Sequence, residues 1–275
     1  METRVTLERA IRIACANPMP RAVENVPLED ARQRVLATPL PSLVDDPRFD
    51  NSAMDGFAVM SSECGSKGTR LKIIGTSQTG GEKPPAIAPG EACKIMTGAP
   101  MPDGADAIVM VEDTQLEGGH VVINGPARPN FIRKRAENLS KGQEALPEGI
   151  QLSSATLALA GTMGHGEVPV IRRPRIAILS TGDELVEPGT ELKPGQIYES
   201  NSHALCSLVE MMGCEATRIA ASNDSMAELR RTLDSLSPYD AILTSGGVSM
   251  GEWDLVRRIM EEEGELAFWR INLRP

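Results

Sequence analysis

The sequence predicts a multidomain protein with a parallel α/β sheet in its C-terminal part and a small β domain in its middle. Beyond residue 173, apolar runs of strand length alternate with amphipathic segments of helix length, which is typical of right-handed βαβ units. Between about residues 42 and 150, short β-like runs lie between clusters of Gly and Pro, as in a small antiparallel domain. The 275 residues are enough for about two domains, each with its own core.

The helices outside the C-terminal part are marked by their end residues. Thr6 caps a first helix, which Pro18 and Pro20 end. A second short helix is expected over Ser153–Ala160, with a Ser at its start and Gly161 as its stop. Between these two helices we expect short strands at Leu71–Ile74, Cys93–Met96, Ala107–Val111 and His120–Ile123.

The C-terminal alternation gives four strands and three helices. The strands are expected at Arg175–Ser180, Ala216–Ala220, Asp240–Ser245 and Leu266–Ile271. The helices are expected at Asn201–Met212, Ser225–Leu236 and Asp254–Glu263, with Gly213 and Gly264 ending the first and third. This order implies a parallel sheet with crossover helices.

Composition excludes several classes of protein. The net charge is −10, and the chain has only eight aromatic residues, so a nucleic-acid surface of basic and stacking groups is not expected. No run approaches the roughly 20 apolar residues of a membrane span, and the charged start is unlike a secretory signal. The five cysteines are odd in number and irregularly spaced, which favours a reducing cytoplasm over a disulfide scaffold or a zinc site.

Two polar loops follow strands of the predicted parallel sheet, where ligands of such sheets bind. Ser180-Thr181-Gly182-Asp183-Glu184 follows the first strand, and Ser245-Gly246-Gly247-Val248-Ser249 follows the third and leads to Asp254. Glycine amides can receive a phosphate, hydroxyls can donate to it, and the carboxylates can hold Mg²⁺. The alternative is that the glycines form ordinary βα turns and that Asp254 caps its helix.

A second polar constellation lies in the β-like region. The run Asp50–Ala58 packs two carboxylates, an amide and a hydroxyl around a Gly, and Thr97–Pro100 forms another polar turn. Ordinary turn chemistry also explains such clusters. Five basic residues follow, which either receive an anion or form a solvated face: Arg128, Arg133, Lys134, Arg135 and Lys141.

Together these motifs resemble the molybdopterin molybdenumtransferase family of the MoeA type, which includes the E domain of gephyrin. The resemblance is carried by Asp50–Ala58, Ile95–Pro100, Arg173–Leu185, Pro194–Asn201 and Thr244–Ser249 with Gly251 and Asp254, in collinear order. It implies three parts: residues 1–41 with 138–172 as an elongated linker domain, 42–137 as an inserted β domain, and 173–275 as the α/β molybdopterin-binding domain.

The resemblance also implies an activity. Members of this family insert molybdate into adenylated molybdopterin with Mg²⁺ or a similar ion, releasing AMP. They form homodimers whose site lies between the α/β domain of one subunit and the β domain of its partner, and a molybdopterin adenylyltransferase is a possible partner. Carried over by motif, the catalytic residues are Asp55, Thr97, Glu184 and Asp254. Of these, Asp55, Glu184 and Asp254 would hold the metal. The pterin nucleotide would contact Ser180, Thr181, Gly182, Asp224, Ser245, Gly246, Gly247 and Ser249. Asp224 can equally be read as part of a helix start.

Three departures from the family pattern stand out. The usual Arg-x-x-Gly-Glu-Asp reads Arg133-Lys134-Arg135-Ala136-Glu137-Asn138, so a carboxylate is lost at position 138. Gln33 stands where a Gly is usual. The chain stops at Pro275, inside a motif that usually continues, so the α/β domain is expected to be incomplete. These departures leave open a non-catalytic molybdopterin-binding or scaffold relative. A molybdopterin adenylyltransferase, which shares the α/β domain, is a further alternative.

Overall fold

The computed structural model describes residues 2, 4–16, 18, 21–182, 184–220, 226–245 and 255–273. The chain divides into two compact units, one formed by residues 1–24 and 170–275 and the other by residues 25–169. Strands β1 (Val23–Pro27) and β12 (Glu167–Ile171) pair where the chain passes from one unit to the other. None of the described helices is both long and apolar enough to cross a bilayer.

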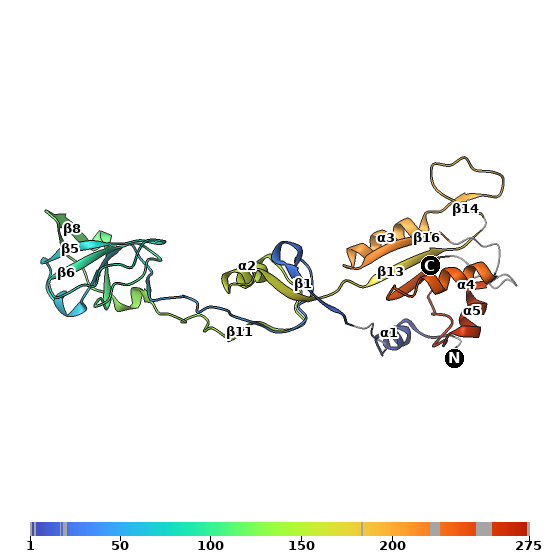
Figure 1. Ribbon diagram of the computed structural model, residues 1–275, viewed down its shortest axis with the longest axis horizontal. Coiled ribbons are helices and arrows are strands. Elements are labelled where there is room, and N and C mark those ends of the chain that lie inside the picture. The colour runs from blue at the N-terminus through green and yellow to red at the C-terminus, as the bar shows by residue number, and fades with distance from the viewer. Residues whose placement is uncertain are drawn as a thin grey trace. The chain divides into compact units, whose positions relative to one another are not determined.

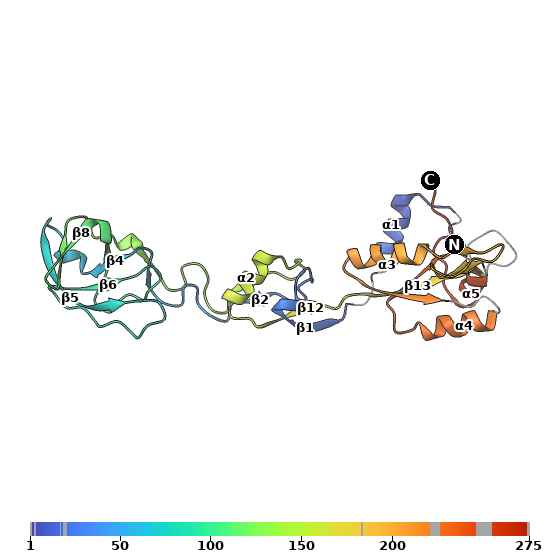
Figure 2. The same ribbon diagram turned by 90° about the horizontal axis from the view of Figure 1, so that it is seen from above.

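The main feature of the unit 25–169 is a curled six-stranded sheet (Figure 2). Its strands lie in the order β7 (Ala107–Met110), β4 (Gly56–Val59), β6 (Glu91–Ile95), β5 (Thr69–Ser77), β9 (His120–Ile123) and β8 (Thr114–Glu117). The expected antiparallel sheet is wrong at one pair, because β5 and β6 run parallel. The Pro-rich segment 78–90 between them is long enough to return the chain to the starting end, which a parallel pair requires.

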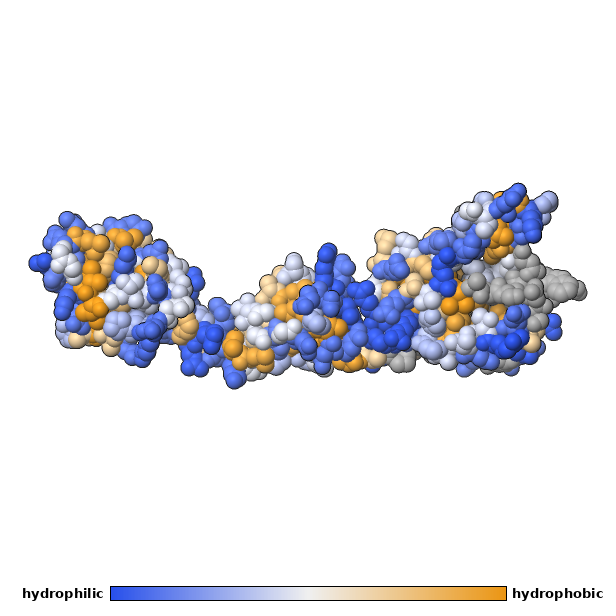
Figure 3. All heavy atoms as spheres, turned by 45° about the horizontal axis from the view of Figure 1, so that its top comes forward, coloured by the Kyte–Doolittle hydropathy of each residue, from blue (hydrophilic) through white to orange (hydrophobic). Residues whose placement is uncertain are grey.

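Both faces of this sheet are covered. On one face Phe57, Val59, Leu71 and Val109 belong to a buried cluster, and on the other Ala58, Ile95 and Ile108 belong to a second. Alternate residues of β4 therefore point into different clusters, as the period of two in a strand requires. On the surface in Figure 3, hydrophobic side chains form separate areas among hydrophilic ones.

The rest of this unit is built from short pairs. β2 (Leu40–Pro41) pairs with β11 (Glu144–Leu146), and β3 (Asn51–Ser52) pairs with β10 (Ile132–Arg133). Single 3₁₀ turns lie at Leu28–Asp30, Ser61–Glu63, Val111–Asp113 and Pro129–Phe131.

Helix α2 (Ser154–Thr162) has the predicted Ser start: Ser153 Oγ accepts from Thr156 N, and Thr156 Oγ1 accepts from Ser153 N. Its predicted stop at Gly161 is wrong, because the helix runs to Thr162 and is capped by Met163.

The other unit contains the predicted parallel sheet. Its strands lie in the order β16 (Glu215–Ala220), β13 (Arg175–Ser180) and β17 (Ala241–Ser245). Helix α3 (Asn201–Met211) covers one face, and α4 (Met226–Ser235) and α5 (Leu255–Glu263) cover the other (Figure 1). Ile176 and Ile178 face α3, whereas Leu179 packs with Leu229 of α4 and Ile259 of α5. The fold-class prediction is confirmed.

The two ends of this unit meet each other. Helix α1 (Leu7–Ala16) begins as predicted, with Thr6 Oγ1 accepting from Arg9 N at 3.3 Å. The fourth strand expected at Leu266–Ile271 is not a member of the sheet. Instead Phe268 and Ile271 form isolated bridges with Glu2 and Val5. An apolar run indicates an extended segment, but it does not indicate which segment will be its partner.

Candidate functional site

The carboxyl ends of β13 and β17 bring several predicted residues together. Ser180 and Ser245 are register partners at the last position of these strands, and Thr181 N donates to Ser245 O at 3.0 Å. β13 lies between two strands that follow it in the chain, so its end is a topological switch point, where open parallel sheets bind ligands. Thr181 is buried, and its Oγ1 has no partner among the described residues.

The Glu184 side chain packs against the backbone of Gly182. Gly182 has a φ of +154°, which only glycine adopts readily. A Cβ at this position would lie within 2.9 Å of both carboxylate oxygens of Glu184. The glycine therefore allows the Glu184 side chain to lie directly over the backbone at the end of β13.

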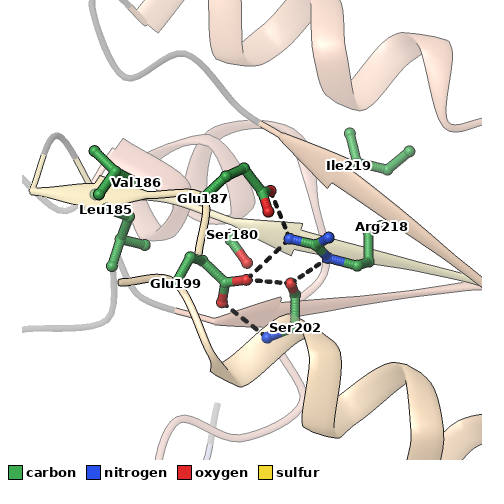
Figure 4. A pocket seen from close by; sticks show the side chains of 9 residues that line it. Ser180, Leu185, Val186, Glu187, Glu199, Ser202, Arg218 and Ile219 are labelled. Atoms are coloured by element: carbon green, nitrogen blue, oxygen red, sulfur yellow. Dashed lines mark hydrogen bonds and ion pairs between the residues drawn. The ribbon is translucent and has the colours of Figure 1, made fainter. Parts of the chain in front are cut away.

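A cavity of about 240 Å³ lies beside the same strand end (Figure 4). Its lining combines apolar side chains with a cluster of charges and hydroxyls: Ser180, Gly182, Leu185, Val186, Glu187, Glu199, Ser202, Arg218 and Ile219. Glu187 and Glu199 follow the two short parallel strands β14 (Leu185–Val186) and β15 (Ile197–Tyr198).

Arg218 joins these two carboxylates. Its Nη2 donates to Glu187 Oε1 at 2.6 Å and to Glu199 Oε2 at 3.3 Å, and its Nε donates to Ser202 Oγ at 2.6 Å. The predicted site did not include Glu187, Glu199, Ser202 or Arg218. They lie up to 31 positions apart in the sequence, and no spacing signal connects them.

Glu199 is a buried carboxylate that stays ionised. Burial alone would raise its pKa, but hydrogen bonds from Ser202 Oγ and Ser202 N and the charge of Arg218 together lower that pKa below its ordinary value. Because Ser202 N belongs to the first turn of α3, Glu199 also supplies an acceptor to the start of that helix.

The unit 25–169 holds the second polar centre. Thr97 donates to Asp55 Oδ1 twice, from its backbone N at 2.7 Å and from Oγ1 at 2.9 Å. These bonds, first the backbone one and then the hydroxyl one, lower the pKa of Asp55, and the charge of Lys94 adds to the effect. The structure therefore brings together two predicted catalytic residues that are 42 positions apart. Asp55 Oδ2 accepts no hydrogen bond from the described residues.

The basic run is the set of five residues Arg128, Arg133, Lys134, Arg135 and Lys141, and the side chains of three of them already have a partner. Lys134 Nζ lies 2.8 Å from Asp50 Oδ2, and Arg135 Nε donates to Asp45 Oδ2 at 2.6 Å. Arg128 lies over the ring of Phe131, 5.5 Å from its centre. Arg133, like Arg128 and the Lys141 side chain, has no carboxylate within 4 Å among the described residues, so its charge is available to an anion.

Several predicted site residues lie outside the described residues: Asp224, Gly246, Gly247, Ser249 and Asp254. Asp55 and Glu184, the other two predicted metal ligands, belong to different units. Within the described ranges, no group of three or more His, Cys, Asp and Glu side chains is placed to hold a metal ion. The assignment of these three carboxylates to a metal therefore stays a prediction.

These features define a multidomain α/β protein with one polar centre at the ends of a parallel sheet and another beside a β sheet. Residues 5–164 match the MoeA N-terminal region (domain I and II), and residues 177–275 match a probable molybdopterin binding domain. The chain belongs to the MoeA family.

Its relatives agree with this assignment. The chain is 37% identical to a molybdopterin molybdenumtransferase of Haemophilus influenzae over 94% of its own length and 64% of the relative's, and 31% identical to that of Bacillus subtilis over 99% and 66%. It thus spans about two thirds of these proteins. A crystal structure of a molybdopterin biosynthesis MoeA protein from Pyrococcus horikosii superposes with a TM-score of 0.85 at 33% identity, covering 99% of this chain and 70% of that one.

Proposed function

We propose that this chain acts in molybdenum cofactor biosynthesis, inserting molybdate into adenylated molybdopterin with release of AMP. The observation that carries the proposal is the Asp55–Thr97 pair in a chain whose relatives are named molybdopterin molybdenumtransferase. The hydroxyls and amides at the end of β13 support it, because a phosphate or an oxyanion needs donors that are fixed before it arrives.

In this proposal, different residues of the chain have different roles. Thr97 orients Asp55 by two hydrogen bonds and keeps it ionised. Ser180, Thr181 and Ser245 lie together at the carboxyl ends of two neighbouring strands, where their hydroxyls would orient the phosphate of the nucleotide. Arg133, which pairs with no described carboxylate, would attract the molybdate anion.

Mg²⁺ belongs to the proposal as well. Carboxylate oxygens are ligands that Mg²⁺ prefers, and Asp55 Oδ2 and the Glu184 carboxylate are suited to this, with Asp254 as a third candidate. When bound, the ion would neutralise phosphate charge.

We also propose a homodimer in which one subunit supplies Asp55 and the other supplies Glu184. Support comes from the location of these two residues in separate units of the chain. The five free cysteines agree with action in a reducing cytoplasm, where a molybdopterin adenylyltransferase would supply the substrate.

The test is AMP release from adenylated molybdopterin with molybdate and Mg²⁺, run on the whole gene product. We expect release that depends on molybdate and falls at least about tenfold in Thr97→Val, with Thr97→Ser as the matched control that keeps the hydroxyl. Absence of AMP release from the wild type would overturn the proposal. Tight pterin binding without turnover would favour the scaffold alternative, and ATP-dependent adenylation of molybdopterin would favour an adenylyltransferase.

A further inference from the structure

A second cavity, of about 390 Å³, lies in the unit 25–169 beside the Asp55–Thr97 pair. It is lined by Asp46, Pro47, Asn51, Gly98, Arg133, Glu137 and Asn138. Two antiparallel segments build it, with Asp46 opposite Leu139 and Asn51 opposite Arg133. Gly98 directly follows Thr97, so the cavity adjoins a predicted catalytic residue.

Asp46 and Asn138 form a fixed pair in this cavity. Asn138 Nδ2 donates to Asp46 Oδ2 at 3.0 Å. The backbones are joined as well, since Asn138 N donates to Asp46 O at 2.9 Å and Asp46 N donates to Leu139 O at 2.8 Å. A carboxylate only accepts, so the Asn138 amide must present its NH₂ group to it.

Other groups in the cavity lack partners. Asn51 is only 8% exposed, yet its Oδ1 accepts no hydrogen bond from the described residues. Arg133, its register partner, pairs with no described carboxylate within 4 Å, and Asp46 Oδ1 likewise accepts no hydrogen bond from them. A buried acceptor without a donor is unfavourable. A ligand that carries both donors and negative charge would satisfy Asn51 and Arg133 together.

We propose that Asp46 is a substrate-binding residue that supplies the carboxylate which the family pattern places at position 138. In this chain Asn138 stands at the usual Asp position, and Asp46 holds a carboxylate oxygen 3.0 Å from the Asn138 amide nitrogen in the same cavity. Position 138 therefore does not leave the site without its negative charge. The inference rests on the proposed function, because the ligand is adenylated molybdopterin or the molybdate that reacts with it.

Four proteins test this: the wild type, Asp46→Asn, Asn138→Asp and the double variant. Asp46→Asn removes the carboxylate, but two facing amides still form a hydrogen bond, so the thermal unfolding temperature should not change. We expect kcat/KM for AMP release to fall at least about tenfold. Asn138→Asp places two carboxylates about 3 Å apart, so its activity should fall at neutral pH and recover as the pH is lowered and the pair shares a proton. The double variant returns a single carboxylate and should regain activity to within about threefold of wild type.

Calorimetric titration with adenylated molybdopterin and with molybdate accompanies the kinetics. Unchanged kcat/KM and affinity in Asp46→Asn would overturn the inference, as would a double variant no better than Asp46→Asn. A wild type that binds but does not turn over would overturn the proposed function alone, and the titrations of the four proteins would then decide the role of Asp46. A wild type that neither binds nor turns over would overturn both.

Discussion

Arg218 makes ion pairs with two carboxylates of very different exposure, and this difference predicts unequal effects of the same substitution. The Glu199 side chain is 8% exposed and receives hydrogen bonds from Ser202 N, Ser202 Oγ and Arg218. In Glu199→Gln, one of the two oxygens becomes an NH₂ group that faces another donor. Since a hydrogen bond to a charged group contributes roughly 1.5–3 kcal/mol, we expect the free energy of unfolding to fall by about 2 kcal/mol.

Glu187→Gln is the matched control. Its side chain is 59% exposed, and an exposed ion pair contributes about 0–1 kcal/mol, so we expect a loss below about 1 kcal/mol. Urea unfolding followed by tryptophan fluorescence measures both, because Trp253 and Trp269 both fall within residues 170–275. A 2 kcal/mol loss corresponds to a roughly thirtyfold change in the unfolding equilibrium constant. Equal losses in the two variants would refute the reasoning that burial decides the strength of these pairs.

Backbone conformation and one ion pair lead to three further expectations for stability. Ala136 has a φ of +62°, so Ala136→Gly should raise the free energy of unfolding by up to about 1 kcal/mol in urea titrations; a decrease would contradict this. A Cβ on Gly56 would lie 2.0 Å from Val109 O, so Gly56→Ala should lower the melting temperature sharply, as measured by circular dichroism. Gly65→Ala is the control: a Cβ on Gly65 would meet no atom within 4 Å, so its melting temperature should stay the same. Hydrogen bonds from Arg172 and the charge of its guanidinium group lower the pKa of Asp240. The free energy of unfolding of the wild type should therefore exceed that of Asp240→Asn by its full amount at pH 7, and the difference should shrink as the pH falls through the lowered pKa. A difference that does not depend on pH would contradict an ionised pair.

The order of strands and helices beyond residue 173 could be predicted from sequence because hydrophobic periodicity is a local property. β13, β16, β17, α3, α4 and α5 all lie within a few residues of their expected ranges. Which segments pair with each other is not a local property of the sequence. The parallel pairing of β5 with β6 and the bridge between Ile271 and Val5 depend on where distant segments meet.

The same distinction applies to the candidate site. Asp55, Thr97, Gly182 and Glu184 belong to contiguous motifs, whereas Arg218 acts through residues of other elements. The structural consequence of two departures from the family pattern became clear only from backbone angles. Gln33 and Ala136 stand at positions where the family pattern has Gly, and both keep a positive φ, so the local turns keep a left-handed residue without the glycine that favours it.

The most direct test of the proposed activity and of a site shared between subunits is complementation between two inactive variants. Asp55→Ala and Glu184→Ala should each abolish AMP release when assayed alone. If each site takes Asp55 from one chain and Glu184 from the other, mixed dimers carry one intact site. Random exchange should then restore about one quarter of the wild-type rate. A mixture that stays inactive after verified subunit exchange, with an active wild type, would contradict the account.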